Sequence, residues 1–191
     1  MRGKRLWHSL RLFTMLKIKD RMQYFRDNDI FHSMGKYCAI MDRKVPLYSK
    51  LISFGDNVKV ASNVTFLTHD TTHFVLNRMD KLIATRGGQK FPEKVGCIEI
   101  GNNVFIGSGT FITYNVKIGS NVIIGACSLV NKDIPDNCVV AGVPARIIET
   151  FEEYLKKRDI NAVDGDGIGN EVVSPGMEEK LWQKFYRDRE K

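Results

Sequence analysis

The sequence predicts a mainly β fold, a solenoid of short parallel strands with helical segments at its ends. Three observations predict it: an aliphatic residue recurs every six positions, asparagine and glycine punctuate that period, and the period is absent from both ends of the chain. The chain has 191 residues, of which 43% are hydrophobic, which suits one domain with a buried core and a modest appendage.

The six-residue period begins clearly at Ile100. Neither a helix nor an alternating strand has this period, whereas a short strand followed by a tight turn does. Asparagine and glycine between the strands accept positive φ at low steric cost, and stacked coils bury one another's faces. A β-sandwich is the alternative, but its strands do not keep one phase through six units. The repeated aliphatic residues are Ile100, Ile106, Ile112, Ile118, Ile124 and Val130. Two positions before each of these, from Ile106 on, is a small or β-branched residue: Val104, Thr110, Val116, Val122 and Ser128. A glycine follows four of the aliphatic residues: Gly101, Gly107, Gly119 and Gly125.

An earlier block keeps the same phase, from Phe54 to Phe66, and the phase is then lost over residues 70–97. This insertion is polar, basic and interrupted by Gly87, Gly88 and Pro92. A loop of this length in a compact domain is usually functional or disordered. Its basic residues either meet an anion or keep the loop solvated.

The formal net charge of +7 favours an anionic partner: nucleic acid, a membrane surface or a phosphorylated small molecule. The chain has no zinc-finger spacing and no aromatic RNA-binding signature, so we expect no nucleic-acid partner. No run of about 18 apolar residues predicts a membrane span, and no leader pattern follows the basic N-terminus. The four cysteines show no disulfide or zinc spacing, and we expect a cytoplasmic protein.

The stretch IGNNVFIGSGTFITYNVKIGSNVIIGACSLVNKDIPDNCVVAGVPARII resembles the hexapeptide-repeat acyltransferases, and among them the galactoside and maltose group of sugar O-acetyltransferases. The resemblance covers residues 54–148. It implies a left-handed parallel β-helix, acetyl-CoA as co-substrate, and a homotrimer with sites between subunits. The inserted loop of that family helps to enclose the active site of a neighbouring subunit.

His69 is the candidate catalytic base. It ends the early repeat block, and the Thr68-His69 pair matches the family's histidine that deprotonates the acceptor hydroxyl. Imidazole suits this role because its pKa lies near neutrality. The alternative is a structural loop histidine. Asp42 is a candidate to orient His69, and the alternative is that it is a solvated aspartate in a turn.

The resemblance also implies a coenzyme A site on the later coils. Ser108 and Ala126 match positions that line the pantetheine arm, and the Ser108 amide matches the oxyanion donor. Asn131 and Lys132 match a family pair, and Arg146 matches an arginine near the nucleotide. Cationic Lys132 and Arg146 suit phosphate oxygens, or are simply solvated charges.

Two further residues, His73 and Phe105, are candidates to contact the acceptor. His73 lines the site or lies on the surface, and Phe105 replaces a tryptophan that the family often has. Phe105 keeps the apolar surface but lacks the indole donor, which leaves the acceptor's identity open. The related carbonic anhydrases bind zinc through three histidines, of which this chain lacks the third, so we expect no metal. A serine or antibiotic acceptor is the enzymatic alternative, and a non-catalytic scaffold the other.

The ends predict helices. Residues 1–30 predict one basic, amphipathic helix that either caps the solenoid, which we favour, or docks on a membrane surface. Residues 149–160 and 177–191 predict two C-terminal helices. The segment DGDGIGNE lacks the EF-hand glutamate, so we reject calcium binding there. The expected domains are an N-terminal helical cap (1–36), a β-helix with its inserted loop (37–148) and a helical extension (149–191).

Overall fold

The computed structural model describes residues 2–161 and 175–189, in two compact units. Met1–Tyr154 contains the N-terminal helices, the strands and the start of α5 (Phe151–Asn161). Leu155–Lys191 contains the rest of α5 and α6 (Pro175–Arg187). The prediction of a mainly β chain with helices at both ends is confirmed.

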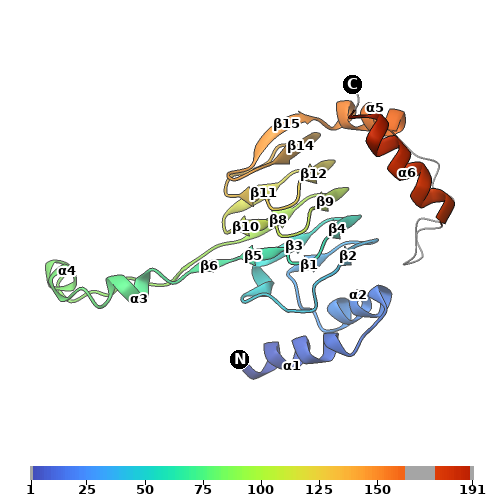
Figure 1. Cartoon of the computed structure of the whole chain (residues 1–191). Helices are drawn as coiled ribbons and strands as arrows, with labels where there is room; N and C mark the ends of the chain where they lie inside the picture. The colour runs from blue at the N-terminus through green and yellow to red at the C-terminus, as the bar shows by residue number, and fades with distance from the viewer. Residues whose placement is uncertain (1, 162–174, 190–191) are drawn as a thin grey trace. The chain divides into compact units, whose positions relative to one another are not determined.

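The strands of the first unit form a three-sided coil, in which the chain visits three sheets in turn (Figure 1). Neighbouring strands in each sheet run parallel, except for the antiparallel pair β14–β15. The first sheet has β1 (Ser33–Met34), β3 (Ile52–Phe54), β8 (Ile98–Ile100) and β11 (Val116–Ile118). The second has β2 (Ala39–Ile40), β4 (Val58–Val60), β9 (Val104–Ile106), β12 (Val122–Ile124), β14 (Cys138–Ala141) and β15 (Arg146–Thr150), and the third has β5 (Thr65–Leu67), β10 (Phe111–Thr113) and β13 (Leu129–Val130).

The aliphatic period lines the interior of this coil. In most three-residue strands the outer two residues point inward and the central one outward, because side chains alternate along a strand. All six repeated aliphatic residues from Ile100 to Val130 are at most 1% exposed. The small residues of the second set, such as Thr110 and Ser128, are buried with them. Both sets therefore face the core of the coil.

One corner of the coil is a ladder of asparagines. Asn57, Asn103, Asn121 and Asn137 each take a φ between 55° and 60°, the left-handed region that asparagine tolerates. The side-chain amides of the first three donate to the oxygen of the next asparagine, at 3.0, 3.0 and 2.8 Å. The same residue type thus makes the turn and links one coil to the next.

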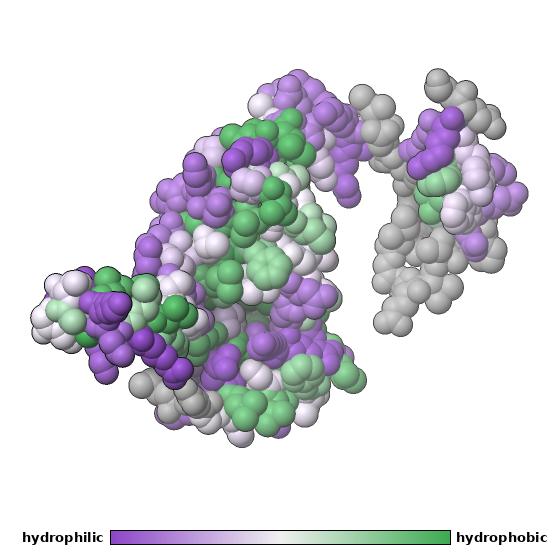
Figure 2. Space-filling model, turned by 60° about the vertical axis from the view of Figure 1, so that its left-hand side comes forward, coloured by the Kyte–Doolittle hydropathy of each residue, from purple (hydrophilic) through white to green (hydrophobic). Residues whose placement is uncertain are grey.

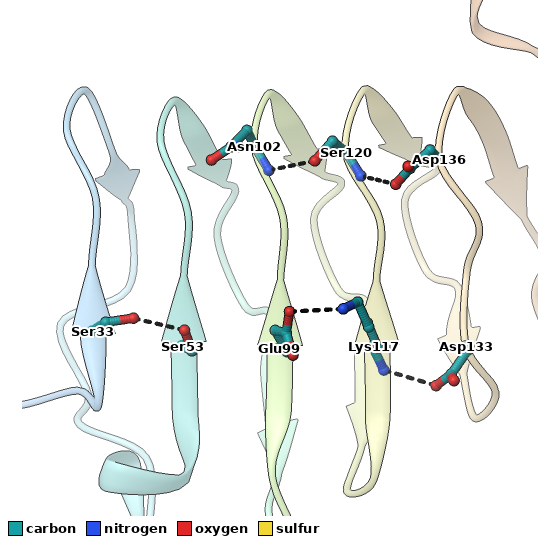
Figure 3. A network of polar contacts seen from close by, with 8 residues as sticks. All are labelled: Ser33, Ser53, Glu99, Asn102, Lys117, Ser120, Asp133 and Asp136. Carbon is teal, nitrogen blue, oxygen red and sulfur yellow. Dashed lines mark hydrogen bonds and ion pairs between the residues drawn. The ribbon is translucent and has the colours of Figure 1, made fainter.

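The repeat glycines serve a different purpose from the one that the sequence suggested. None of Gly101, Gly107, Gly119 and Gly125 has a positive φ. A Cβ on Gly101 would instead lie 2.7 Å from the Gly119 carbonyl oxygen in the next coil. The adjacent turn residues bond across the same gap: Asn102 N–H donates to Ser120 Oγ at 3.1 Å, and Ser120 N–H to Asp136 Oδ1 at 2.6 Å (Figure 3). Close approach of the coils excludes side chains at these glycines.

The N-terminal segment forms two helices, so the single helix expected over residues 1–30 is wrong. α1 (Arg2–Phe13) ends before a turn, and α2 (Ile18–Asp27) follows. The buried Arg21 lies at the break, where its Nη1 donates to the carbonyls of Met15 and Leu16, both at 3.2 Å. These carbonyls lie in the turn and are free to accept. α2 buries Met22 and Phe25 against the first coil.

The insertion is an arm on a two-stranded base. The strands β6 (His69–Asp70) and β7 (Lys94–Val95) pair antiparallel, and the short helices α3 (His73–Leu76) and α4 (Asp80–Thr85) lie beyond them (Figure 1). Val58 pairs with Val104, 46 residues later, whereas Val104 pairs with Val122, 18 residues later; the difference of 28 residues is the arm. The coil therefore continues as though the arm were absent.

A short 3-10 helix (Ser49–Leu51) precedes β3. No helix in the described ranges is both long and apolar enough to cross a membrane. The segment DGDGIGNE, where calcium binding was rejected, lies outside the described residues.

We expect Gly101→Ala to lower the free energy of unfolding by about 1–3 kcal/mol, the usual cost of overpacking. Gly3→Ala in α1 is the matched control, because nothing lies within 4 Å of its added Cβ and alanine favours a helix. Urea unfolding of both variants measures the difference. Equal stability of the two variants would contradict close coil stacking at Gly101.

Candidate active site

His69 lies where the chain leaves the coil for the arm. The preceding Thr68 is fully buried, and its hydroxyl donates to the Leu47 carbonyl at 2.7 Å. The Thr68 carbonyl accepts the Gly96 N–H at 2.9 Å, which closes the base of the arm. His69 is thus fixed between a coil strand, the segment before β3 and the end of the arm.

A pocket of about 360 Å³ opens beside His69. This volume is within the usual range for small-molecule sites. The pocket lies along β5 and the segment after β2, and one residue of α1, Arg5, reaches it. The lining residues are Arg5, Asp42, Lys44, Pro46, Leu47, Asn63, Val64, Thr65, Phe66 and His69.

The ring of His69 has one aromatic contact and one buried nitrogen without a hydrogen-bond partner among the described residues. Tyr48 meets it edge-on, with ring centroids 5.4 Å apart. His69 Nδ1 is buried and has no hydrogen-bond partner among the described residues. Buried polar atoms are nearly always satisfied, so a ring nitrogen without a partner requires an explanation.

Tyr48 connects His69 to the arm. Its φ of 52° places it in the left-handed region, and its hydroxyl donates to Glu93 Oε2 at 2.9 Å. This hydrogen bond raises the pKa of Tyr48, so the phenol remains protonated and remains a donor. No pattern in the sequence marks Tyr48 or Glu93, because their proximity depends on the path of the arm.

Asp70 anchors the start of the arm to the second complete coil. Asp70 Oδ1 accepts from the Thr72 hydroxyl at 2.7 Å, and Oδ2 accepts from the Tyr114 hydroxyl at 2.8 Å. The hydrogen bonds from Thr72 and Tyr114 lower the pKa of Asp70, and Lys94 adds to this effect. Lys94 Nζ lies 5.3 Å from the centre of the Tyr114 ring.

Asp42 has a structural role. Its two carboxylate oxygens accept the backbone N–H groups of Asn63 and Val64, both at 3.0 Å. The hypothesis that Asp42 orients His69 finds no hydrogen bond to support it. Asp42 instead fixes the turn before β5, on the wall of the pocket.

The five residues expected at coenzyme A lie on two corners and at the end of the coil, and all are exposed. Ser108 and Ala126 stack on the corner between the second and third sheets, where Ser108 O accepts the Cys127 N–H at 2.8 Å. Asn131 and Lys132 follow β13 at the other edge of the third sheet, and Arg146 begins β15. The third sheet therefore lies between the pair Ser108 and Ala126 and the pair Asn131 and Lys132.

The two expected acceptor residues do not meet His69 on one surface of the coil. His73 begins α3 in the arm, with its ring 4.2 Å from that of Phe74, and its Nδ1 is buried without a partner in the part of the chain that the structure describes. Phe105 is 45% exposed on the second sheet, between Lys59 and Ile123, whereas His69 follows the third.

No group of three or more histidine, cysteine, aspartate or glutamate side chains is placed to hold a metal ion in residues 2–161 and 175–189.

Comparison with known proteins identifies the repeat. The family model "Bacterial transferase hexapeptide (six repeats)" matches residues 97–132. The galactoside O-acetyltransferase of Escherichia coli K12 is 43% identical over 106 residues, which are 55% of this chain and 47% of that protein. Protein CapG of Staphylococcus aureus is 40% identical over 109 residues, 56% of this chain and 57% of that protein. The chain thus spans only about half the length of these curated relatives. A solved galactoside acetyltransferase in complex with coenzyme A has a TM-score of 0.58 at 27% identity, over 90% of this chain and 89% of that one.

The Asp70 anchor should make stability depend on pH. A lowered folded-state pKa stabilises the fold above the unfolded pKa of about 3.9, and this contribution is lost as the pH falls through the folded value. We therefore expect Asp70→Asn to be less stable than the wild type at neutral pH, with the difference lost as the pH falls through the lowered pKa of Asp70. Urea unfolding at several pH values measures this. Tyr114→Phe is the companion variant, and an unchanged Asp70 pKa in it, measured by NMR, would contradict the anchor.

Proposed function

Because this chain belongs to the bacterial transferase hexapeptide family, we propose that it transfers an acetyl group from acetyl-CoA to a hydroxyl of a sugar or polysaccharide precursor. The observation that carries the proposal is that His69, whose buried Nδ1 has no partner among the described residues, lines a pocket of small-molecule size. The galactoside acetyltransferase with bound coenzyme A, similar over most of this chain, supports the co-substrate and the acceptor class.

His69 is the general base of the proposed reaction. It takes the proton of the acceptor hydroxyl while the hydroxyl oxygen attacks the thioester carbonyl. The C–S bond then breaks and the coenzyme A thiolate leaves. His69 passes the proton that it took from the hydroxyl to this thiolate. Base assistance of this kind gives roughly 10²–10⁴-fold. The transfer is direct in a ternary complex, and the backbone N–H of Ser108 is the donor to the oxyanion.

Coenzyme A lies along the third sheet in this proposal. Ser108 and Ala126 line its pantetheine arm from one corner, and Asn131 lies at the other. Lys132 and Arg146 are exposed cations at the end of the coil toward β15, and they bind the phosphates of the nucleotide.

The working enzyme is a homotrimer of left-handed coils with its sites between subunits. Exposed apolar side chains support an assembly: Phe74, Val75 and Met79 of the arm are 63%, 68% and 48% exposed, and Phe111 on the third sheet is 46% exposed. Figure 2 shows hydrophobic side chains on the coil and on the arm. A neighbouring subunit would bring Phe105, or the His73 arm, to the His69 of another copy. We place the enzyme in the cytoplasm.

We expect His69→Ala to lower acceptor-dependent release of coenzyme A by about 10²–10⁴-fold, because the base is removed while the pocket remains. The assay follows free thiol from acetyl-CoA with a panel of sugars, glycosides, serine and chloramphenicol. His73→Ala is the matched histidine control and should retain more activity. Thermal unfolding of both variants checks that the fold is intact.

The panel also separates the alternatives. Activity with serine or chloramphenicol, but with no sugar, would replace the sugar acceptor by an amino-acid or antibiotic one. No thiol release with any acceptor, together with no calorimetric binding of acetyl-CoA, would favour a non-catalytic scaffold. Full activity of His69→Ala would exclude His69 as the base.

We expect Lys132→Ala and Arg146→Ala to raise the KM for acetyl-CoA by about 10-fold each, since each removes a charge-assisted hydrogen bond to phosphate, and to leave kcat nearly unchanged. The control is Lys36→Ala, which removes an exposed cation before β2. If both variants have the same KM for acetyl-CoA as Lys36→Ala, then Lys132 and Arg146 do not bind the cofactor.

A further inference from the structure

The outer face of α1 is apolar and exposed to solvent. Leu6, Leu10 and Phe13 follow one another by four and three residues, which places them on one face of the helix. They are 62%, 59% and 59% exposed, and the neighbouring Trp7 is 57% exposed. A helix face of this kind needs a partner, because large apolar side chains gathered on one surface mark an interaction site.

The inner face of α1 is fixed, so the helix cannot turn to bury its outer face. His8 Nδ1 bonds with the Tyr24 hydroxyl at 2.8 Å, and the Val45 N–H donates to Ser9 Oγ at 3.1 Å. Leu12 is fully buried in the core. The first coil is covered by α2, whose Met22 Sδ accepts the Ile40 N–H at 3.3 Å. α1 is therefore free to meet something outside this chain.

The charge of this segment selects the partner. Residues 1–19 contain no acidic residue and six basic ones, whereas the whole chain has a net charge of +7. Lys4 and Arg11 lie three residues before and four after Trp7, so they border the apolar face on its tryptophan side. Both are exposed, as are Lys17 and Lys19 in the following segment. The six basic residues are Arg2, Lys4, Arg5, Arg11, Lys17 and Lys19.

We propose that α1 docks on the surface of an anionic lipid bilayer. Leu6, Leu10 and Phe13 enter the boundary between headgroups and acyl chains, Trp7 lies at headgroup level, and Lys4 and Arg11 meet the lipid phosphates. The helix lies flat, since 12 residues are far fewer than the ~20 that a span requires. Apolar and basic residues on one helix are the two elements that bilayer binding combines.

This docking would place the pocket near lipid headgroups. Arg5, on the inner side of α1, lines the pocket that holds His69. An acceptor attached to a lipid could then reach the pocket without leaving the bilayer surface. This consequence rests on the proposed function, whereas the docking itself does not, and vesicle binding tests the docking separately.

The experiment is sedimentation of the full chain with vesicles. Phosphatidylcholine vesicles are compared with mixed phosphatidylcholine and phosphatidylglycerol vesicles, at low and high salt. We expect binding to the mixed vesicles at low salt and little binding at high salt, where charges are screened. In a Trp182→Phe background, the remaining Trp7 should shift its fluorescence to the blue on binding.

Two pairs of substitutions test the two elements of the surface. Leu6→Gln with Leu10→Gln should lower the partition coefficient at least about 10-fold, because two apolar side chains no longer leave water. Lys4→Gln with Arg11→Gln should lower it about 5-fold for each charge on the anionic vesicles. Ile147→Gln with Ile148→Gln on β15 is the control and should bind as the wild type, since these residues are 57% and 60% exposed, as much as the leucines.

Three outcomes would overturn the proposal. The wild type remains in the supernatant with anionic vesicles at low salt; the Leu6 and Leu10 pair binds as well as the wild type; or the control pair loses as much binding. If the wild type fails to bind while the leucine substitutions lower the association state in sedimentation velocity without lipid, the face is a contact between copies instead. Circular dichroism confirms that each variant is folded.

Discussion

The close stacking of one coil on the next is the constraint on which the rest of this structure depends. Each coil must place its three strands at hydrogen-bonding distance from those of the next, and its corners must approach equally closely. Glycine satisfies this requirement at Gly101, because a Cβ would lie 2.7 Å from the Gly119 carbonyl oxygen. Asparagine satisfies it two positions later, at Asn103, because it tolerates the left-handed turn and its side chain donates to Asn121 of the next coil.

The arm leaves this stack without disturbing it. The chain departs after Thr68 and returns at Gly96, and the hydrogen bond between these two residues closes the gap. Long insertions at such a position cost little, since the loop-closure entropy grows slowly with length. The rigid coil thus holds His69, while the arm brings Glu93 to Tyr48 and Asp70 to Tyr114. A rigid scaffold that presents polar groups at a loop base is the usual construction of a binding site.

The two N-terminal helices have different roles. An open coil end exposes apolar surface and requires a cover, which α2 provides with Met22 and Phe25. α1 packs mainly through Leu12 and polar bonds, and it leaves its apolar face outside. The basic charge that the composition shows is concentrated here, and the two observations together favour a lipid surface over a purely structural role for α1.

The sequence by itself determined the period of the coil, the residues of its core and the extent of the inserted arm. These are local properties. The inward side chains of a strand and the turn residues repeat at fixed spacing, so they can be recognised in the sequence alone. The sequence also placed His69 at the base of the arm. Only the tertiary structure decided that the repeat glycines serve close packing rather than positive φ, and that Asp42 holds a turn. It alone brought Arg5, Tyr48 and Glu93 to the site, because those contacts join segments that are remote in the chain and whose spacing carries no period.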